Sequence, residues 1–71
     1  MNEENVLDWA VLHGENVQIR KHGLKVRHGR VDAVSADASV LWIEANGPFL
    51  RTLVEKSQGY TVWPRAQNGG N

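Results

Sequence analysis

The sequence contains no cysteine, only two prolines, and no apolar run long enough to cross a membrane. The absence of cysteine excludes disulfide bonds and metal sites built on thiolates. Without a stretch of about 20 apolar residues, the sequence offers no candidate membrane-spanning helix. The acidic start MNEENV also lacks the basic and then apolar order of a secretory signal peptide. Together these absences predict a soluble, cytoplasmic protein.

The chain is also short, because its 71 residues can form at most one domain. A core of this size rarely supplies more than about 3–5 kcal/mol of stability without disulfides, a metal or oligomerisation. The missing cysteines remove the first of these supports and the thiolate metal sites with it. Self-association is the support that remains, so we expect a homo-oligomer.

Charge of one sign is missing from each of two neighbouring segments. Residues 1–16 hold four acidic residues and no Lys or Arg, whereas residues 17–31 hold five Lys or Arg and no acid. The whole chain nevertheless has a net charge of zero. A basic segment in a neutral chain is typical of a solvated surface, of a surface beside an acidic neighbour, or of a nucleic-acid contact. All three interpretations stay open at the level of sequence.

The hydrophobic pattern predicts a mainly β fold with one short helix. Helical spacing over residues 3–13, with Gly14 as a stop, indicates an N-terminal helix. Short, bent antiparallel strands of the kind that follow usually close into a small barrel. We therefore predict an SH3-like or Sm-like barrel domain over residues 1–64 and a disordered tail over residues 65–71. The five predicted strands cover residues 17–20, 24–36 (with an interruption at Gly29), 39–45, 49–56 and 60–64.

The basic segment falls on the first predicted hairpin, which turns at a His-Gly pair. Folding residues 17–28 about this turn predicts Arg20 opposite Lys25 and Gln18 opposite Arg27. Like charges directly opposite each other destabilise a strand pair by about 0.2–1 kcal/mol. A bound phosphate backbone, or an acidic neighbouring surface, would offset that cost.

These observations favour a protein that binds RNA or single-stranded nucleic acid with low sequence specificity. Charge reversal at Arg27 is expected to abolish such binding. The alternative is a protein-interaction module of the same SH3-like fold, for example one encoded by a phage or mobile element, without a nucleic-acid role. Steep salt dependence would separate the first function from the second. The predicted phosphate contacts are Arg20, Lys25, Arg27, Arg30 and Lys56.

Two sequence patterns occur in the same order as in a known family of small barrels. In VQIRKHGLKVRHGRVDAVS, alternating apolar residues precede a Gly, an apolar residue two positions on, and a further apolar residue. VEKSQGYTVWP has an apolar strand that ends in Lys, a Gly turn, and an apolar pair closed by Pro. With the predicted helix and the bent second strand, these patterns resemble the bacterial Sm-like RNA chaperones over residues 3–64. The matching positions are Val17, Ile19, Gly29, Val31, Val34, Val54, Lys56, Gly59, Val62, Trp63 and Pro64.

The resemblance implies an RNA-binding ring in which the fourth strand of one subunit pairs with the fifth strand of the next. Such a ring would cover edge strands that are otherwise exposed. The chain departs from the family pattern at Ser35, which replaces an Asp, and at Ser57, which replaces a His. Its SADASV loop is longer and lacks the aromatic residue that stacks on a base. The predicted interface, with filling of the monomer core as the open alternative, consists of Phe49, Leu53, Tyr60, Val62 and Trp63.

No pattern in the sequence indicates catalysis, a metal or a cofactor. There is no Gly-rich phosphate loop, no nucleophile motif and no pair of buried carboxylates. The three His residues fall on separate predicted elements, so they do not suggest a metal site. Of the Trp residues, Trp42 is predicted in the core and Trp63 on a contact surface for bases or a proline-rich peptide. We therefore predict a binding protein and not an enzyme.

Overall fold

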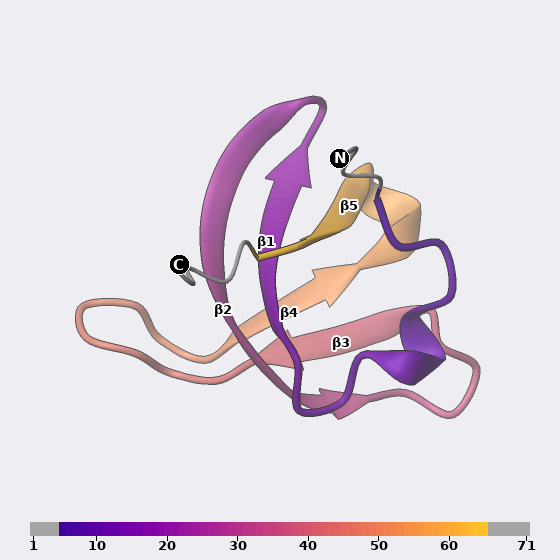
Figure 1. Ribbon diagram of the computed structural model, residues 1–71, viewed down its shortest axis with the longest axis horizontal. Coiled ribbons are helices and arrows are strands. Elements are labelled where there is room, and N and C mark those ends of the chain that lie inside the picture. Colours follow the sequence, from indigo (N-terminus) through magenta and orange to yellow (C-terminus); the bar gives the residue numbers. More distant parts are fainter. Residues whose placement is uncertain (1–4, 66–71) are drawn as a thin grey trace.

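The computed structural model describes residues 5–65, which form five antiparallel strands in one open sheet (Figure 1). The predicted mainly β class is confirmed, while the predicted tail lies outside the described residues apart from Arg65. The sheet order is β4-β3-β2-β1-β5, so the last two strands of the chain lie at opposite edges. Along the chain the elements are η1 (Trp9–Val11), β1 (Asn16–Lys21), β2 (Leu24–Val34), β3 (Val40–Ile43), β4 (Thr52–Glu55), η2 (Lys56–Gln58) and β5 (Tyr60–Pro64).

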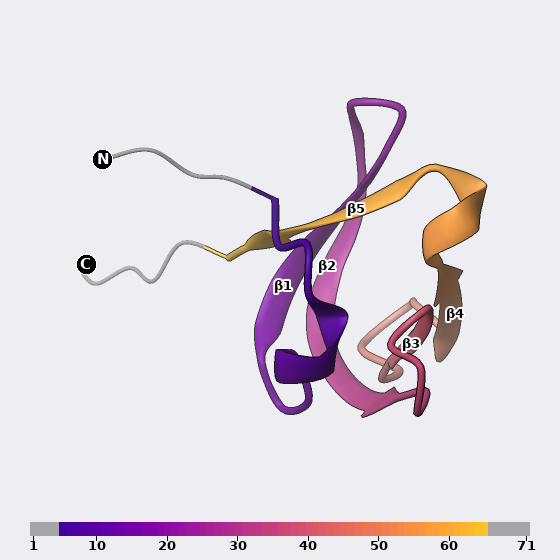
Figure 2. The same ribbon diagram turned by 90° about the vertical axis from the view of Figure 1, so that its right-hand side faces the viewer.

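The long strand β2 belongs to both halves of the sheet. Its first part pairs with β1 and its second part pairs with β3. Figure 2 shows the consequence, with β1, β2 and β5 close together and with β3 and β4 turned to the other side of the molecule. The sheet is therefore strongly bent about β2, and its concave side encloses the core.

The predicted helix over residues 3–13 is wrong, because the described part of that range contains only the three-residue 3-10 turn η1. The carboxylate of Asp8 accepts a hydrogen bond from the Ala10 N–H at 3.0 Å and caps the turn at this point. Before the cap the chain runs beside β5, where the Val6 N–H donates to the Val62 carbonyl at 2.6 Å. No helix within residues 5–65 has the length and apolar character that a membrane span requires.

The core lies inside the bend and takes side chains from η1, the segment after it and all five strands. Gly29 sits where β3 approaches β2 closely, because a Cβ there would lie 2.5 Å from Cγ2 of Ile43. The interruption predicted at Gly29 is therefore a close approach of β3 to a continuous β2. The buried apolar residues are Trp9, Leu12, Val17, Ile19, Val31, Leu41, Ile43, Val54 and Val62.

The first hairpin turns where the sequence predicts. His22 and Gly23 have φ values of 52° and 82°, as a two-residue type I′ turn requires at both central positions. Beyond the turn, Arg20 lies opposite Lys25, which confirms that predicted pairing. The like-charge contact across the hairpin is thus present in the structure.

The predicted register fails one step further along this hairpin. Between Ile19 and Arg20 the register shifts, so Arg27 lies opposite Ile19 and not opposite Gln18. The shift makes Val26 the extra residue of a β-bulge. Because directly opposite residues share a face of the sheet, Arg27 points inward with Ile19.

Candidate nucleic-acid interface

The convex side of β5, β1 and β2 carries a set of polar and basic side chains. Val17, Ile19 and Val62 point into the core, so the residues that alternate with them point outward. The register aligns these outward residues, with Gln18 opposite both Trp63 and His28. We call the set the outer basic face; it consists of Asn16, Gln18, Arg20, Lys25, His28, Arg30, Thr61, Trp63 and Arg65.

The outer basic face has a surplus of positive charge that the acidic residues in the described part of the chain do not neutralise. Four of its members are Lys or Arg and none is acidic. Arg30 forms an ion pair with Glu44 at 3.4 Å, at the margin of the face, with both side chains nearly half exposed. Such an exposed ion pair contributes little to the stability of the fold. Within residues 5–65, Lys25 and Arg65 have no ion-pair partner.

A stacked pair of planar groups lies on this face. The guanidinium of Arg20 is 4.1 Å from the centre of the Trp63 ring. Arg20 Nε donates to Gln18 Oε1 at 2.6 Å, and the Trp63 indole N–H donates to Thr61 Oγ1 at 2.9 Å. These contacts orient both groups. They also offset part of the repulsion between Arg20 and Lys25, since a cation over an exposed ring is worth about 0.5–1 kcal/mol.

Arg27, in contrast, is a structural residue. It is only 6% exposed, and its Nη1 donates to the Leu50 carbonyl and to Thr52 Oγ1, both at 2.8 Å. Its Nη2 donates to the Glu44 carbonyl at 3.2 Å, and its guanidinium lies 4.8 Å from the Phe49 ring centre. The predicted phosphate contact at Arg27 does not fit this burial. Charge reversal there would damage the fold and cannot report on binding.

Lys56 also lies away from the outer basic face. It is the first residue of η2, and its Nζ donates to the Leu7 carbonyl at 2.7 Å. The same ammonium is 5.0 Å from the ring centre of Trp9. Lys56 therefore holds the N-terminal segment against η2. Of the predicted phosphate contacts, the structure brings together Arg20, Lys25 and Arg30.

All five aromatic residues of the chain have a cation against the ring. These contacts involve five of the eight Lys and Arg residues. The three that lie over no ring in the described part of the chain are Lys25, Arg30 and Arg65, and all three belong to the outer basic face. The ring contacts are Arg20–Trp63, Lys21–Tyr60, Arg27–Phe49, Arg51–Trp42 and Lys56–Trp9.

Among the Lys, Arg and His members of the face, sequence reasoning missed two. His28 points outward only because the bulge at Val26 reverses the alternation that the sequence suggests. Arg65 was assigned to the tail, yet its N–H donates to the Asn16 carbonyl at 3.4 Å and extends the pairing of β5 with β1. Trp63 lies beside Arg20, and its role as a contact surface stays a prediction, whereas Trp42 is half-buried under Arg51.

Of the five residues predicted for an oligomer interface, Trp63 lies on the outer basic face and the other four separate into two groups. Val62 is fully buried and Tyr60 packs against the core, so for these the core-filling alternative describes the structure. Phe49 and Leu53 are 48% and 42% exposed. The β5 edge is partly blocked, because Pro64 has no N–H and Val6 already bonds the Val62 carbonyl.

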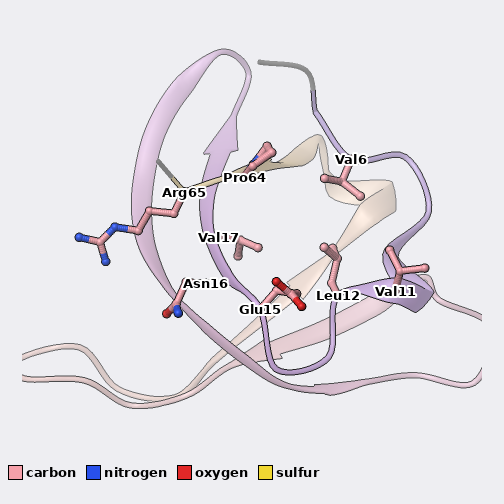
Figure 3. Close-up of a pocket in the computed structure, with 8 residues that line it drawn as sticks. All are labelled: Val6, Val11, Leu12, Glu15, Asn16, Val17, Pro64 and Arg65. Atoms are coloured by element: carbon pink, nitrogen blue, oxygen red, sulfur yellow. The ribbon is translucent and has the colours of Figure 1, made fainter. Parts of the chain in front are cut away.

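A hollow of about 380 Å³ lies between the N-terminal segment and the end of β5 (Figure 3). Val6, Leu12 and Val17 line it, the carboxylate of Glu15 points into it, and Arg65 points away. The residues that line the hollow include no nucleophilic side chain beside that carboxylate. Within residues 5–65, no three His, Asp or Glu side chains come together as metal ligands would.

Comparisons of the chain with protein-family models, with curated proteins and with solved structures found no match. The resemblance to Sm-like proteins therefore rests on the sequence patterns alone. The case for a binding site on the outer basic face depends on the charge and geometry of the face itself.

Proposed function

We propose that the protein binds RNA or single-stranded nucleic acid through the outer basic face, as a homo-oligomer and without catalytic activity. The supporting observation is that Lys25, Arg30 and Arg65, the cations that lie over no ring, surround the Arg20–Trp63 stack. Lys and Arg draw in phosphates. A base can stack on an aromatic ring or on a guanidinium plane.

The arrangement of these groups favours single strands over duplexes. Arg65 is two residues from Trp63 on the same strand, whereas Lys25 and Arg30 lie on β2, separated from it by β1. A single strand crossing the three strands would meet a cation on each side of the ring while its bases face the sheet. In a duplex the bases are already stacked and paired, so Trp63 would add nothing to the affinity.

We also propose that the bent sheet closes as a small barrel of the Sm-like or SH3-like type. The curvature of β2 and the order β4-β3-β2-β1-β5 support this closure. The two edge strands, β4 and β5, support self-association, because an uncovered strand edge tends to pair with another chain. The partly blocked edge of β5 weighs against a ring made by pairing β4 with β5.

The test is fluorescence anisotropy with a labelled oligo-uridine and a labelled single-stranded DNA of equal length, over a series of salt concentrations. With four phosphate contacts, the logarithm of the affinity should fall with the logarithm of salt at a slope of about −3. Lys25→Glu should weaken binding by about tenfold or more, because it reverses a charge on the face. The same reversal at Lys56, outside the face, should leave binding unchanged.

Thermal unfolding of both variants shows whether each is still folded. Equal losses of affinity for Lys25→Glu and Lys56→Glu would contradict the assignment of the face. Absence of salt-dependent binding to either strand would contradict the function, and the protein-interaction module would then be the better account.

A further inference from the structure

The edge strand β4 has one side that pairs with no other strand in the described part of the chain. The Lys56 N–H donates to the Ser39 carbonyl on the β3 side at 2.9 Å, in line with the β3–β4 register. In an antiparallel pair, every second residue directs both its N–H and its C=O to the same neighbour. Val54 and Thr52 therefore also bond to β3. The residues between them direct their backbone groups away from β3, toward the free edge; these are Arg51, Leu53 and Glu55.

The same three residues carry a self-complementary set of side chains. Val54 is buried, so its neighbours Leu53 and Glu55 project from the opposite face of the strand, and Arg51 continues the alternation. Leu53 is 42% exposed and lies between a positive and a negative residue. A two-fold axis through Leu53 exchanges the positions of these two charges.

We propose that two copies of the protein pair through β4, antiparallel and about a two-fold axis centred on Leu53. Leu53 then lies opposite Leu53 of the partner subunit, and Arg51 lies opposite Glu55 of the partner subunit, once on each side. The two five-stranded sheets become one continuous sheet. This inference rests on the self-association proposed above and specifies the contact that produces it.

Charge and hydrogen bonding both select this register. Each directly opposite pair that directs its backbone groups inward exchanges two hydrogen bonds, and the register contains three such pairs. Moving the axis to Glu55 or to Arg51 would instead place two like charges opposite each other, which destabilises a strand pair. A register shift of one residue would oppose outward-directed groups to groups already bonded to β3. An axis through Thr52 or Val54 would oppose outward-directed groups but would place Leu53 opposite a charged residue. The axis through Leu53 pairs Leu53 with itself and joins the two opposite charges.

Neighbouring groups fit the same contact. Arg51 uses Nε and Nη2 for Asp32, and its Nη1 has no hydrogen-bond partner within residues 5–65. This donor remains for Glu55 of the partner subunit. Leu50 is 81% exposed, and the register sets it beside η2 of the partner subunit. Since the strand is short, we expect a dimer that forms and dissociates with protein concentration.

Cysteine cross-linking tests the register directly, because the chain has no cysteine of its own. Opposite Cα atoms of a hydrogen-bonded pair lie about 5.5 Å apart, and disulfides span about 4.4–6.8 Å. Leu53→Cys should therefore oxidise to a covalent dimer at least tenfold faster than Glu55→Cys, whose two copies lie four residues apart, about 13 Å. A mixture of Arg51→Cys and Glu55→Cys should cross-link between the two variants. Equal rates for Leu53→Cys and Glu55→Cys would overturn the proposal.

Light scattering supplies a second readout that needs no cysteine. Glu55→Arg should abolish the dimer by placing two positive charges opposite each other, and the exchange Arg51→Glu with Glu55→Arg should restore it. Glu15→Arg, the same charge change outside β4, serves as the control. A monomer of 7.9 kDa at every concentration would overturn both this contact and the proposed self-association. An oligomer that Glu55→Arg leaves intact would overturn the β4 contact alone.

Discussion

The two halves of the sheet, which share β2, differ in how their charged side chains are paired. In the half formed by β2, β3 and β4, Asp32 accepts hydrogen bonds from Nε and Nη2 of Arg51, the shortest at 2.9 Å, while Arg51 also covers Trp42. In the half formed by β5, β1 and β2, Lys25 and Arg65 face no acid in the described part of the chain. Asp32 and Arg51 thus neutralise each other, whereas Lys25 and Arg65 have no acidic partner within residues 5–65.

The same contrast separates neighbours on β2. Arg27 is buried and bonds three groups that belong to β4 and to the loop between β3 and β4, whereas Lys25 is exposed and belongs to the outer basic face. The basic stretch therefore supplies both a structural cation and exposed cations of the outer basic face. Variants that act on one half and spare the other will show whether this division is real.

The largest effect is expected for Arg27→Ala, which would remove the link between β2 and the β3–β4 loop. The change leaves the acceptors on Leu50, Thr52 and Glu44 without their donor, so we expect a loss of about 3 kcal/mol in unfolding free energy. Urea denaturation measures it. Lys25→Ala, two residues away on the outer basic face, is the matched control and should change stability by less than about 0.5 kcal/mol. Similar losses for both variants would remove the distinction between the two cations.

The next largest effect is expected for Gly29→Ala, at the strand position that joins both halves. The added Cβ would lie 2.5 Å from Cγ2 of Ile43 and 3.2 Å from Nη2 of Arg27. Overpacking of this kind costs about 1–3 kcal/mol, and urea denaturation again measures it. In an Ile43→Ala background, which lacks Cγ2, Gly29→Ala should cost less and so recover part of that loss. No recovery would show that β3 does not approach β2 as closely as described.

A smaller effect, on the affinity for single-stranded nucleic acid, is expected when Trp63 is replaced. Trp42 provides the comparison in the other half of the sheet. Trp63→Leu should weaken single-strand binding by about tenfold, because stacking of one base on an aromatic ring is worth about 1–3 kcal/mol. Trp42 has a guanidinium 4.3 Å from its ring centre, much as Trp63 does, but lies in the other half. Trp42→Leu is therefore the control and should bind as the parent does. If it weakens binding equally, the outer basic face is not the site of stacking.

Much of the fold follows from the sequence, because local signals determine it. The alternation of Val17 and Ile19 with polar residues indicates β1, and the positive φ that Gly23 readily adopts indicates the first turn. The helix was overpredicted since Asp8, two residues before Ala10, offers a cap that starts a short turn late in the segment. Hydrophobic spacing alone does not show whether the helical segment begins at residue 3 or only after Asp8.

The candidate site was only partly predictable for a different reason. Alternation correctly assigned Arg20 and Lys25 to one face, but the bulge at Val26 reverses the face of everything after it up to the next irregularity. The inward-pointing guanidinium of Arg27 donates hydrogen bonds to carbonyls of the β3–β4 loop, which lie more than fifteen residues away along the chain. Such a long-range contact leaves no local signal in the sequence. Arg65 was missed because a residue after a strand-ending Pro resembles a tail.

The smallest expected effect concerns the internally neutralised half and its response to acid. The hydrogen bond from the Arg51 guanidinium holds the pKa of the Asp32 carboxyl below its usual value. The pair therefore stabilises the folded state fully above the carboxyl pKa of the unfolded chain, about 3.8, and the stabilisation is lost as the pH falls through the lower folded value. The difference in Tm between the parent and Asp32→Asn should be constant near neutrality and shrink in this acidic range.

Both proteins must be compared at each pH, because a second carboxylate contributes to the acid response. Hydrogen bonds from Ser39 and Ser35 also lower the pKa of Asp37, so the parent loses stability in acid for more than one reason. Subtracting the Asp32→Asn curve isolates the contribution of Asp32. On the outer basic face, Lys25→Gln should give a Tm difference that does not change over the same range, because no carboxylate pairs with Lys25 in the described part of the chain. A difference that varies with pH for Lys25→Gln, or stays flat for Asp32→Asn, would contradict the assignment of internal neutralisation to one half of the sheet alone.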